Sequence, residues 1–198
     1  MIELSLFVED FGHEEFLTSL IERLAQESAT TVRVRARSVR GGRGKVLTEL
    51  SQYVVDIEKR REPMPDLLVV ATDANCQGYA TRKKEIEKAA LRLVQIQPEK
   101  LLVAIPDPHV ERWMLVDSHA FKAVLGRGCE APDQKCQRER YKHMLLTAMK
   151  AAGIVPPLGG MEYARDIVQH LDLERAGQLD PSLGSAISAL RSGLKSTR

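Results

Sequence analysis

Short apolar runs alternate along the first half of the chain with segments in which apolar residues recur at helical spacing. Residues 2–8 (IELSLFV) predict a buried strand, and the apolar positions over 14–26 predict the helix that follows it. Over 31–37, small or apolar residues alternate strictly with arginines, which is the period of a strand with one solvent-exposed face. A further helix is predicted over 45–60.

The same alternation continues through the middle of the chain. Residues 66–72 (DLLVVAT) and 101–105 (LLVAI) predict two more buried strands, and a charged helix is predicted between them over 79–94. Near-continuous apolar strands that alternate with amphipathic helices are typical of a mostly parallel sheet covered on both faces. We therefore expect an α/β fold with a mostly parallel, four-stranded, Rossmann-like sheet flanked by helices.

After Pro108 the pattern changes to helices alone. Three more helices are predicted, over 109–125, 138–152 and 161–171. Residues 184–198 are small and polar, so we expect this end of the chain to fray. The 198 residues suffice for one well-buried domain with an appendage. We expect an α/β domain over 1–125 and a helical C-terminal extension over 126–198 packed on it.

Composition narrows the class of protein. The chain has 29 Lys and Arg against 27 Asp and Glu, which excludes a generally polycationic nucleic-acid coat but leaves room for a local basic patch. No apolar run approaches the roughly 20 residues of a membrane span, and the N-terminus lacks the features of a secretion signal. The three cysteines include no CxxC pair, so we expect neither a disulfide framework nor a zinc site, and a cytoplasmic location.

Acidic and amide side chains follow three of the predicted strands. Glu9 and Asp10 follow the first strand, Asp73 and Asn75 follow the third, and Glu111 comes shortly after the fourth. The carboxyl ends of parallel strands meet at one edge of the sheet, where ligands bind. Clustered carboxylates repel one another unless a cation neutralises them, and oxygen ligands favour Mg²⁺ or Mn²⁺. Any one of these residues alone is more often a solvated loop residue than a ligand, so the prediction depends on their convergence.

Three short motifs carry a family resemblance. A strand ends in Glu in LFVE (6–9), a strand ends in a DxD-like element in VVATDAN (69–75), and a Glu-x-Trp-x-Leu stretch follows in ERWML (111–115). In this order the segments resemble the Toprim domain, in particular the small Toprim-like proteins akin to the overcoming-lysogenization-defect nucleases. The resemblance covers the chain from Ile2 to about Leu125.

The resemblance implies a reaction. Toprim enzymes act on phosphodiester bonds with a divalent metal ion. Topoisomerases pair this domain with a separate tyrosine-bearing domain, for which this chain has little room, so the resemblance implies water as the nucleophile and hydrolysis by a metal-dependent nuclease. Lys142 would bring a positive charge to the phosphate in the transition state. The alternative for Lys142 is a solvated position on a helix face.

The resemblance also implies roles for the residues that match its motifs. Glu9 would be a metal ligand or the general base, and Asp73 would be the central ligand of Mg²⁺ or Mn²⁺. Asn75 would assist, while Glu111 would hold a second metal ion or orient the attacking water. Asp10 would be a further metal ligand and would compensate for the carboxylate that is missing from the metal shell.

The chain departs from the Toprim pattern at three places. Asp10 replaces the usual Gly, His13 stands where many relatives have an acid or a neutral residue, and Asn75 replaces the second acid of DxD. The amide removes one charge from the metal shell, so a non-catalytic Toprim-fold regulatory or binding subunit of an ATPase complex is the alternative. Similar small proteins accompany an ATPase, which implies an effector of anti-phage defence. A phosphorylated receiver module fits less well, because no fifth strand ending in Lys is evident.

A basic segment without acids spans residues 30–45. We predict that it binds nucleic acid, with DNA favoured over RNA, through Arg33, Arg35, Arg37, Arg40, Arg43 and Lys45. Contacts of this kind with phosphates give binding that is independent of sequence and sensitive to salt. The alternative is an edge strand protected by its charges against aggregation. Formation of a homo-oligomer stays open.

Overall fold

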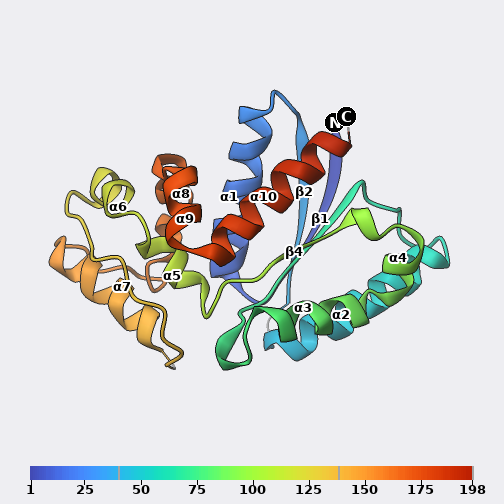
Figure 1. The fold of residues 1–198 in the computed structure, drawn as a ribbon, viewed down its shortest axis with the longest axis horizontal. Coiled ribbons are helices and arrows are strands. Elements are labelled where there is room, and N and C mark those ends of the chain that lie inside the picture. Colours follow the sequence, from blue (N-terminus) through green and yellow to red (C-terminus); the bar gives the residue numbers. More distant parts are fainter. Residues whose placement is uncertain (40, 138, 198) are drawn as a thin grey trace.

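Four parallel strands lie at the centre of the structure, a computed structural model that describes residues 1–39, 41–137 and 139–197 (Figure 1). The strands are β1 (Ile2–Val8), β2 (Val32–Ser38), β3 (Leu67–Ala71) and β4 (Leu101–Ala104). Their order in the sheet is β2-β1-β3-β4, and every neighbouring pair is parallel. The predicted α/β fold with a four-stranded parallel sheet is therefore confirmed.

Helices and loops connect the strands and make up the rest of the described chain. They are α1 (Phe11–Glu27), α2 (Gly42–Glu58), α3 (Tyr79–Ala89), α4 (Leu91–Ile96), α5 (Val110–Leu115), α6 (Ser118–Leu125), α7 (Arg140–Ala151), α8 (Ala164–His170), α9 (Leu173–Leu179) and α10 (Pro181–Ser196), with single 3-10 turns η1 (Asn75–Gln77), η2 (Pro98–Lys100) and η3 (Met161–Tyr163). The single helix predicted over 109–125 is two helices, because the Asp117 carboxylate accepts hydrogen bonds from the N–H groups of His119 and Ala120 and starts α6. The helix predicted over 79–94 is likewise divided, at Ala90.

The two faces of the sheet are covered by different sets of helices (Figure 1). Side chains of β1 alternate between the faces, so that Leu6 lies on one face and Phe7 on the other. The Leu6 face packs against α1, α5, α8 and α10 and contains the buried Trp113. The Phe7 face packs against α2, α3 and α4. Both faces are apolar, which explains why the strands appear in the sequence as near-continuous apolar runs.

The expectation that residues 184–198 fray is wrong for the residues described, because residues 181–196 form the long helix α10. The Asp180 carboxylate caps the helix by accepting hydrogen bonds from the N–H groups of Ser182 and Leu183. The buried side chains of α10 recur at helical spacing: Leu183, Ile187, Leu190 and Leu194. Gly193 packs so closely that a Cβ there would lie 2.7 Å from Leu102 of β4. The small residues thus let α10 approach the sheet.

The C-terminal helices share the core of the sheet. Helix α8 packs on α1, and α10 lies along β4. Within the described part of the chain, no helix is long and apolar enough to cross a membrane.

Candidate functional site

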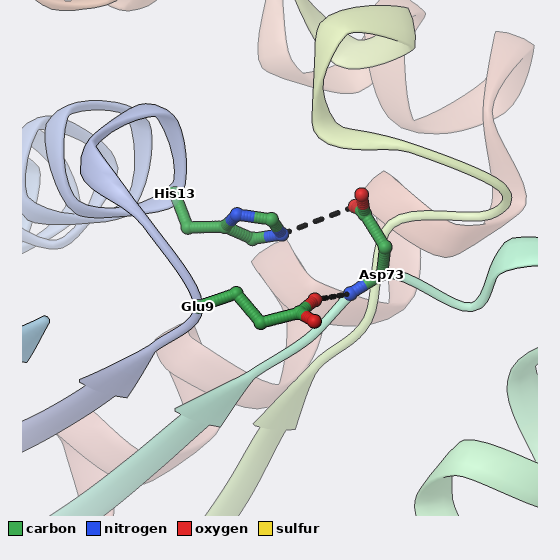
Figure 2. Close-up of side chains that lie close together, drawn as sticks. All are labelled: Glu9, His13 and Asp73. Carbon is green, nitrogen blue, oxygen red and sulfur yellow. Dashed lines mark hydrogen bonds and ion pairs between the residues drawn. The ribbon is translucent and has the colours of Figure 1, made fainter. Parts of the chain in front are cut away.

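Acidic side chains from separate segments meet at the carboxyl end of the sheet, as predicted. The Asp73 backbone N–H donates a hydrogen bond of 2.8 Å to Glu9 Oε2, which joins the segments that follow β1 and β3 (Figure 2). Asp73 Oδ1 accepts a hydrogen bond of 3.0 Å from the N–H of Val110, the first residue of α5. Asp10 caps α1 by accepting from the His13 N–H at 3.0 Å. The sheet edge and two helix N-termini therefore hold this acidic cluster in place.

His13 lies inside this cluster, with its side chain fully buried. Its Nδ1 is 2.9 Å from Asp10 Oδ1. Its Nε2 is 3.1 Å from Asp73 Oδ1 (Figure 2). Burial by itself lowers the pKa of His13, but the charge of Asp73 and hydrogen bonds to both carboxylates outweigh it, so the pKa is raised well above its ordinary value. Burial opposes ionisation of Asp10 too, yet the hydrogen bond with His13 lowers the pKa of Asp10 to about 2. The two carboxylates therefore favour the imidazolium form of His13.

The pKa values of two glutamates in the cluster are raised. Burial raises the pKa of Glu9, and its interactions with the backbone of Asp73 and Arg43 offset this only in part. Burial and the nearby charge of Asp73 raise the pKa of Glu111, in the first turn of α5. A carboxylate with a raised pKa suits proton transfer near neutral pH, and a metal ion nearby would favour its ionised form.

A pocket of about 540 Å³ opens over the cluster. The residues around it include Asp10, Asp73, Asn75, Glu111, Arg82 and Lys142. Asp10, Asp73, Asn75, Glu111 and Lys142 had been predicted as site residues, and the structure brings all five to one pocket. Glu9 lies behind Asp73, through the hydrogen bond to its N–H. Lys142, on α7, is exposed and lies 3.6 Å from Glu139.

Asn75 uses its side chain within the protein. Its Nδ2 donates to the carbonyl oxygen of Asp73 at 3.3 Å, and its Oδ1 lies 3.0 Å from His109 Nε2. The amide oxygen that was expected to assist a metal ion therefore has a hydrogen-bond partner in His109.

The donor set nevertheless fits a divalent cation. Glu9, His13 and Asp73 each offer an atom within 4.8 Å of the others. In its imidazolium form His13 has no nitrogen lone pair for a metal ion, so the carboxylates remain as ligands. Among the described residues, neither Asp73 Oδ2 nor the Glu111 carboxylate accepts a hydrogen bond from another residue. Unpartnered carboxylate oxygens of this kind are what Mg²⁺ and Mn²⁺ prefer.

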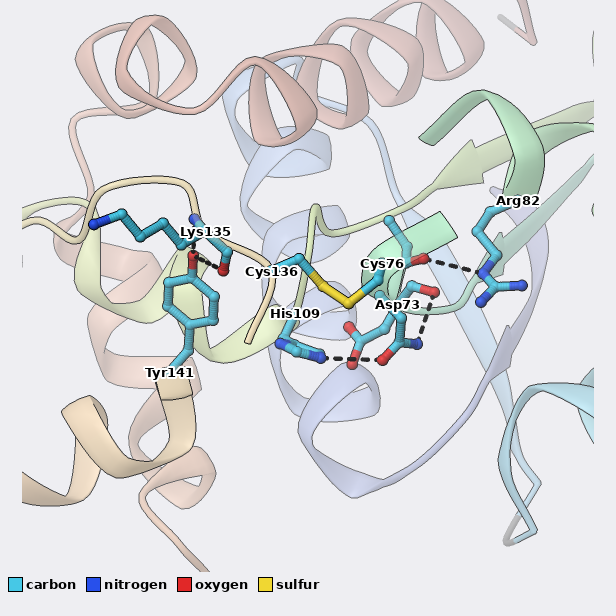
Figure 3. The surroundings of a disulfide bond; sticks show 9 residues. Asp73, Cys76, Arg82, His109, Lys135, Cys136 and Tyr141 are labelled. Atoms are coloured by element: carbon cyan, nitrogen blue, oxygen red, sulfur yellow. Dashed lines mark hydrogen bonds between the residues drawn. A yellow bond between two sulfur atoms is a disulfide. The ribbon is translucent and has the colours of Figure 1, made fainter. Parts of the chain in front are cut away.

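A disulfide closes one side of the pocket, contrary to the sequence-based expectation. Cys76 of η1 is bonded to Cys136 in the loop before α7 (Figure 3). The expectation was wrong because the two cysteines are 60 residues apart, and their spacing says nothing of their proximity in the fold. The Tyr141 hydroxyl also holds this loop, since it accepts a hydrogen bond of 2.8 Å from the Lys135 N–H. Cys129 remains a free thiol, and burial raises its pKa to about 11.

The predicted basic segment lies mostly on the edge strand β2 and at the start of α2. Arg33 and Arg35 both pair with Glu3, at 3.2 and 3.1 Å, and Arg37 pairs with Glu62 at 3.1 Å. The structure leaves these three arginines outside the acidic pocket, each with an acid beside it. Their binding to nucleic acid stays a prediction.

The remaining members of the segment have separate positions. Arg43 pairs with Glu85 of α3, and Lys45 is exposed on α2. Arg40 lies outside the described residues.

Sequence analysis missed Arg82, which lies beside the pocket and is only 5% exposed. Its Nε donates to the Ala74 carbonyl oxygen at 3.2 Å, and its Nη1 donates to Glu85 at 2.8 Å. Arg82 stands in a strongly charged helix, where a solvated position is the usual expectation. The sequence carries no signal that separates it from its exposed neighbours Lys83 and Lys84.

One comparison with known proteins found a relationship. A family model described as a domain of unknown function, DUF4276, matches residues 8–191. No curated protein and no solved structure matched the chain. The family match covers β2, β3, β4 and most of the C-terminal helices, and it includes every residue that lines the pocket. The chain therefore belongs to the DUF4276 family of domains of unknown function.

Proposed function

We propose that this protein is a Toprim-like nuclease that hydrolyses phosphodiester bonds of nucleic acid, favouring DNA, with Mg²⁺ or Mn²⁺. One observation carries the proposal: Asp73 lines a pocket together with Glu111, is joined to Glu9 behind it by the hydrogen bond from its N–H, and presents an unpartnered carboxylate oxygen. The motifs LFVE, VVATDAN and ERWML, which resemble the Toprim domain, support the same assignment.

Each side chain has a task in this reaction. Asp73 and Glu9 would hold a metal ion, which would polarise the phosphoryl oxygen and acidify the attacking water. Glu111, whose pKa is raised, accepts the proton of the attacking water. Lys142 faces the same pocket and offsets the negative charge that develops on the phosphate. His13 orients Asp73 through the bond to its Oδ1.

The resemblance alone supports two wider parts of the proposal: an ATPase partner and a role as effector of anti-phage defence. The cytoplasmic location is proposed from the few cysteines of the sequence. The disulfide between Cys76 and Cys136 counts against a permanently reducing compartment, since such bonds persist where conditions are oxidising.

A non-catalytic regulatory subunit is the second candidate. Asn75 favours it, because this residue replaces an acid of the Toprim motif and its amide oxygen is engaged by His109. In this alternative the pocket would bind a metal ion weakly or not at all, and the protein would act through a partner such as an ATPase.

Cleavage of supercoiled plasmid tests the proposal. Purified protein is incubated with Mg²⁺, Mn²⁺ or EDTA, beside Glu9→Ala, Asp73→Ala and the control Glu49→Ala, which changes an exposed acid on α2. We expect metal-dependent nicking that falls at least about 100-fold in the first two variants and is unchanged in the control. Equal nicking in Asp73→Ala contradicts the proposed centre. Absence of both nicking and Mn²⁺ binding supports the regulatory candidate.

A further inference from the structure

Two arginines, of which Arg82 lines the acidic pocket, share one carboxylate. Arg82 Nη1 donates to Glu85 Oε2 at 2.8 Å, and Arg43 pairs with the same oxygen. The hydrogen bond from Arg43 is the main cause of the lowered pKa of Glu85, which keeps this carboxylate ionised. Two guanidinium groups against one carboxylate leave a net charge of one positive unit on these three side chains.

Arg82 has hydrogen-bonding capacity that the protein does not use. A guanidinium group carries five N–H donors. In the described part of the chain, Arg82 Nε donates to the Ala74 carbonyl oxygen and Nη1 to Glu85, while Nη2 donates to no other residue. Ala74 lies between Asp73 and Asn75, so the guanidinium is held against the segment that carries the central acid.

The positive charges flank the acids on two sides. Arg82 lies on the opposite side of Asp73 from Tyr141, which belongs to the same helix, α7, as Lys142 (Figure 3). Both Arg82 and Lys142 contribute to the walls of the pocket. A polyanionic strand that crosses the pocket would therefore meet a positive charge on each side of the acidic floor.

We propose that Arg82 and Arg43, joined by Glu85, form a phosphate-binding subsite that takes a phosphate of a nucleic-acid strand next to the one that is cleaved. This inference rests on the proposed function for the identity of the strand. A guanidinium group matches the oxygens of a phosphate through two parallel hydrogen bonds, and its charge is retained when it is buried. The subsite would fix the strand while the acidic cluster acts on the neighbouring phosphodiester.

The test measures binding of a fluorescein-labelled, 12-nucleotide oligothymidylate by fluorescence anisotropy, in EDTA and at several salt concentrations. We expect Arg82→Gln to weaken binding about fivefold and to reduce the salt slope by about 0.7, the value for one phosphate contact on a single strand. Glu85→Gln should tighten binding, because it removes the counter-charge of both arginines. The control is Arg92→Gln, whose exposed guanidinium pairs with Glu58 away from the pocket.

Opposite shifts in Arg82→Gln and Glu85→Gln support the subsite, since a purely structural role would give losses in both. No binding by the wild-type protein, or no tightening in Glu85→Gln, overturns it. Should Arg82→Gln unfold, Arg43→Gln takes its place, and unchanged binding there also overturns the subsite. Plasmid cleavage is measured separately. If the affinities of Arg82→Gln and Glu85→Gln shift in opposite directions but no cleavage occurs, the subsite is supported and hydrolysis is rejected. If cleavage occurs but the affinities do not shift, only the subsite is rejected.

Discussion

The buried imidazole of His13 lies 3.1 Å from Asp73, although the two residues are 60 positions apart. This contact places a positive charge between carboxylates that would otherwise repel one another. The acidic cluster is thus neutralised in part by the protein itself. A metal ion would bind the carboxylate oxygens that do not contact His13 and would neutralise the cluster further.

Replacing His13 with Gln should lower stability in a way that depends on pH. The pKa of His13 is raised, so its contribution is fully present below its ordinary value of 6.5 and is lost as pH rises through the folded-state value. The pKa of Asp10 is lowered to about 2 from 3.8, so its contribution is present above 3.8 and is lost as pH falls toward 2. The variant's loss of unfolding free energy should be greatest between about pH 4 and 6.5, where we expect about 3 kcal/mol. Thermal melts from pH 3 to 9 measure it.

A difference in Tm between wild type and His13→Gln that stays constant over this range would mean that His13 is neutral. The control is His143→Gln, an exposed position on α7.

Replacing Glu111 with Gln should reduce the rate of plasmid cleavage about 100-fold while the fold stays intact, because the variant cannot accept a proton from water. The raised pKa of Glu111 further predicts that the wild-type rate increases with pH through that value. Cleavage assays at several pH values and a circular dichroism spectrum check both points. Glu49→Gln, an exposed acid on α2 outside the pocket, is the control and should keep its activity. Unfolding of Glu111→Gln would instead mean that Glu111 is structural.

Reduction of the disulfide, or Cys76→Ser, should loosen the loop over residues 126–137. The bond closes a segment of 60 residues, for which the chain-entropy relation gives about 4 kcal/mol of stabilisation. Limited trypsin digestion should then cut first in this loop, after Lys135 or Arg127, and denaturant unfolding should report the loss. The control Cys129→Ser changes the free thiol. Equal digestion of reduced and oxidised protein would show that other contacts, such as those of Tyr141, are enough to hold the loop.

Replacing Asp180 with Ala should destabilise the protein by about 4 kcal/mol, because the change leaves the guanidinium of Arg112 buried without its ion-pair partner. It also removes the cap of α10. Asp172→Ala removes the exposed cap of α9 and an exposed ion pair with Arg175, and it should cost about 1 kcal/mol. Urea unfolding compares the two variants. Similar losses in both would show that the cap, and not the buried ion pair, is the main contribution of Asp180.

The sequence by itself determined the strands and the edge at which the acids meet. Periods of two and of about 3.6 residues are local properties, so the alternation over 2–8 and 14–26 could be followed directly. Parallel strands share one carboxyl edge, and this alone predicted that Glu9, Asp73 and Glu111 converge. The expectation that residues 184–198 fray followed from their small and polar composition, although Leu183, Ile187, Leu190 and Leu194 recur at helical spacing. The close fit of Gly193 against the sheet is visible only in the structure.

Only the tertiary structure decided which residues complete the site. His13 reaches Asp73, Arg82 reaches Ala74, and Cys76 reaches Cys136 through the way in which the helices are placed around the sheet. Burial also makes the charged forms of His13 and Arg82 depend on their neighbours, because a charged side chain that leaves water must find a partner of opposite charge or a hydrogen bond. Burial and partnership depend on the packing of distant segments, and the spacing of residues in a single sequence does not contain that information.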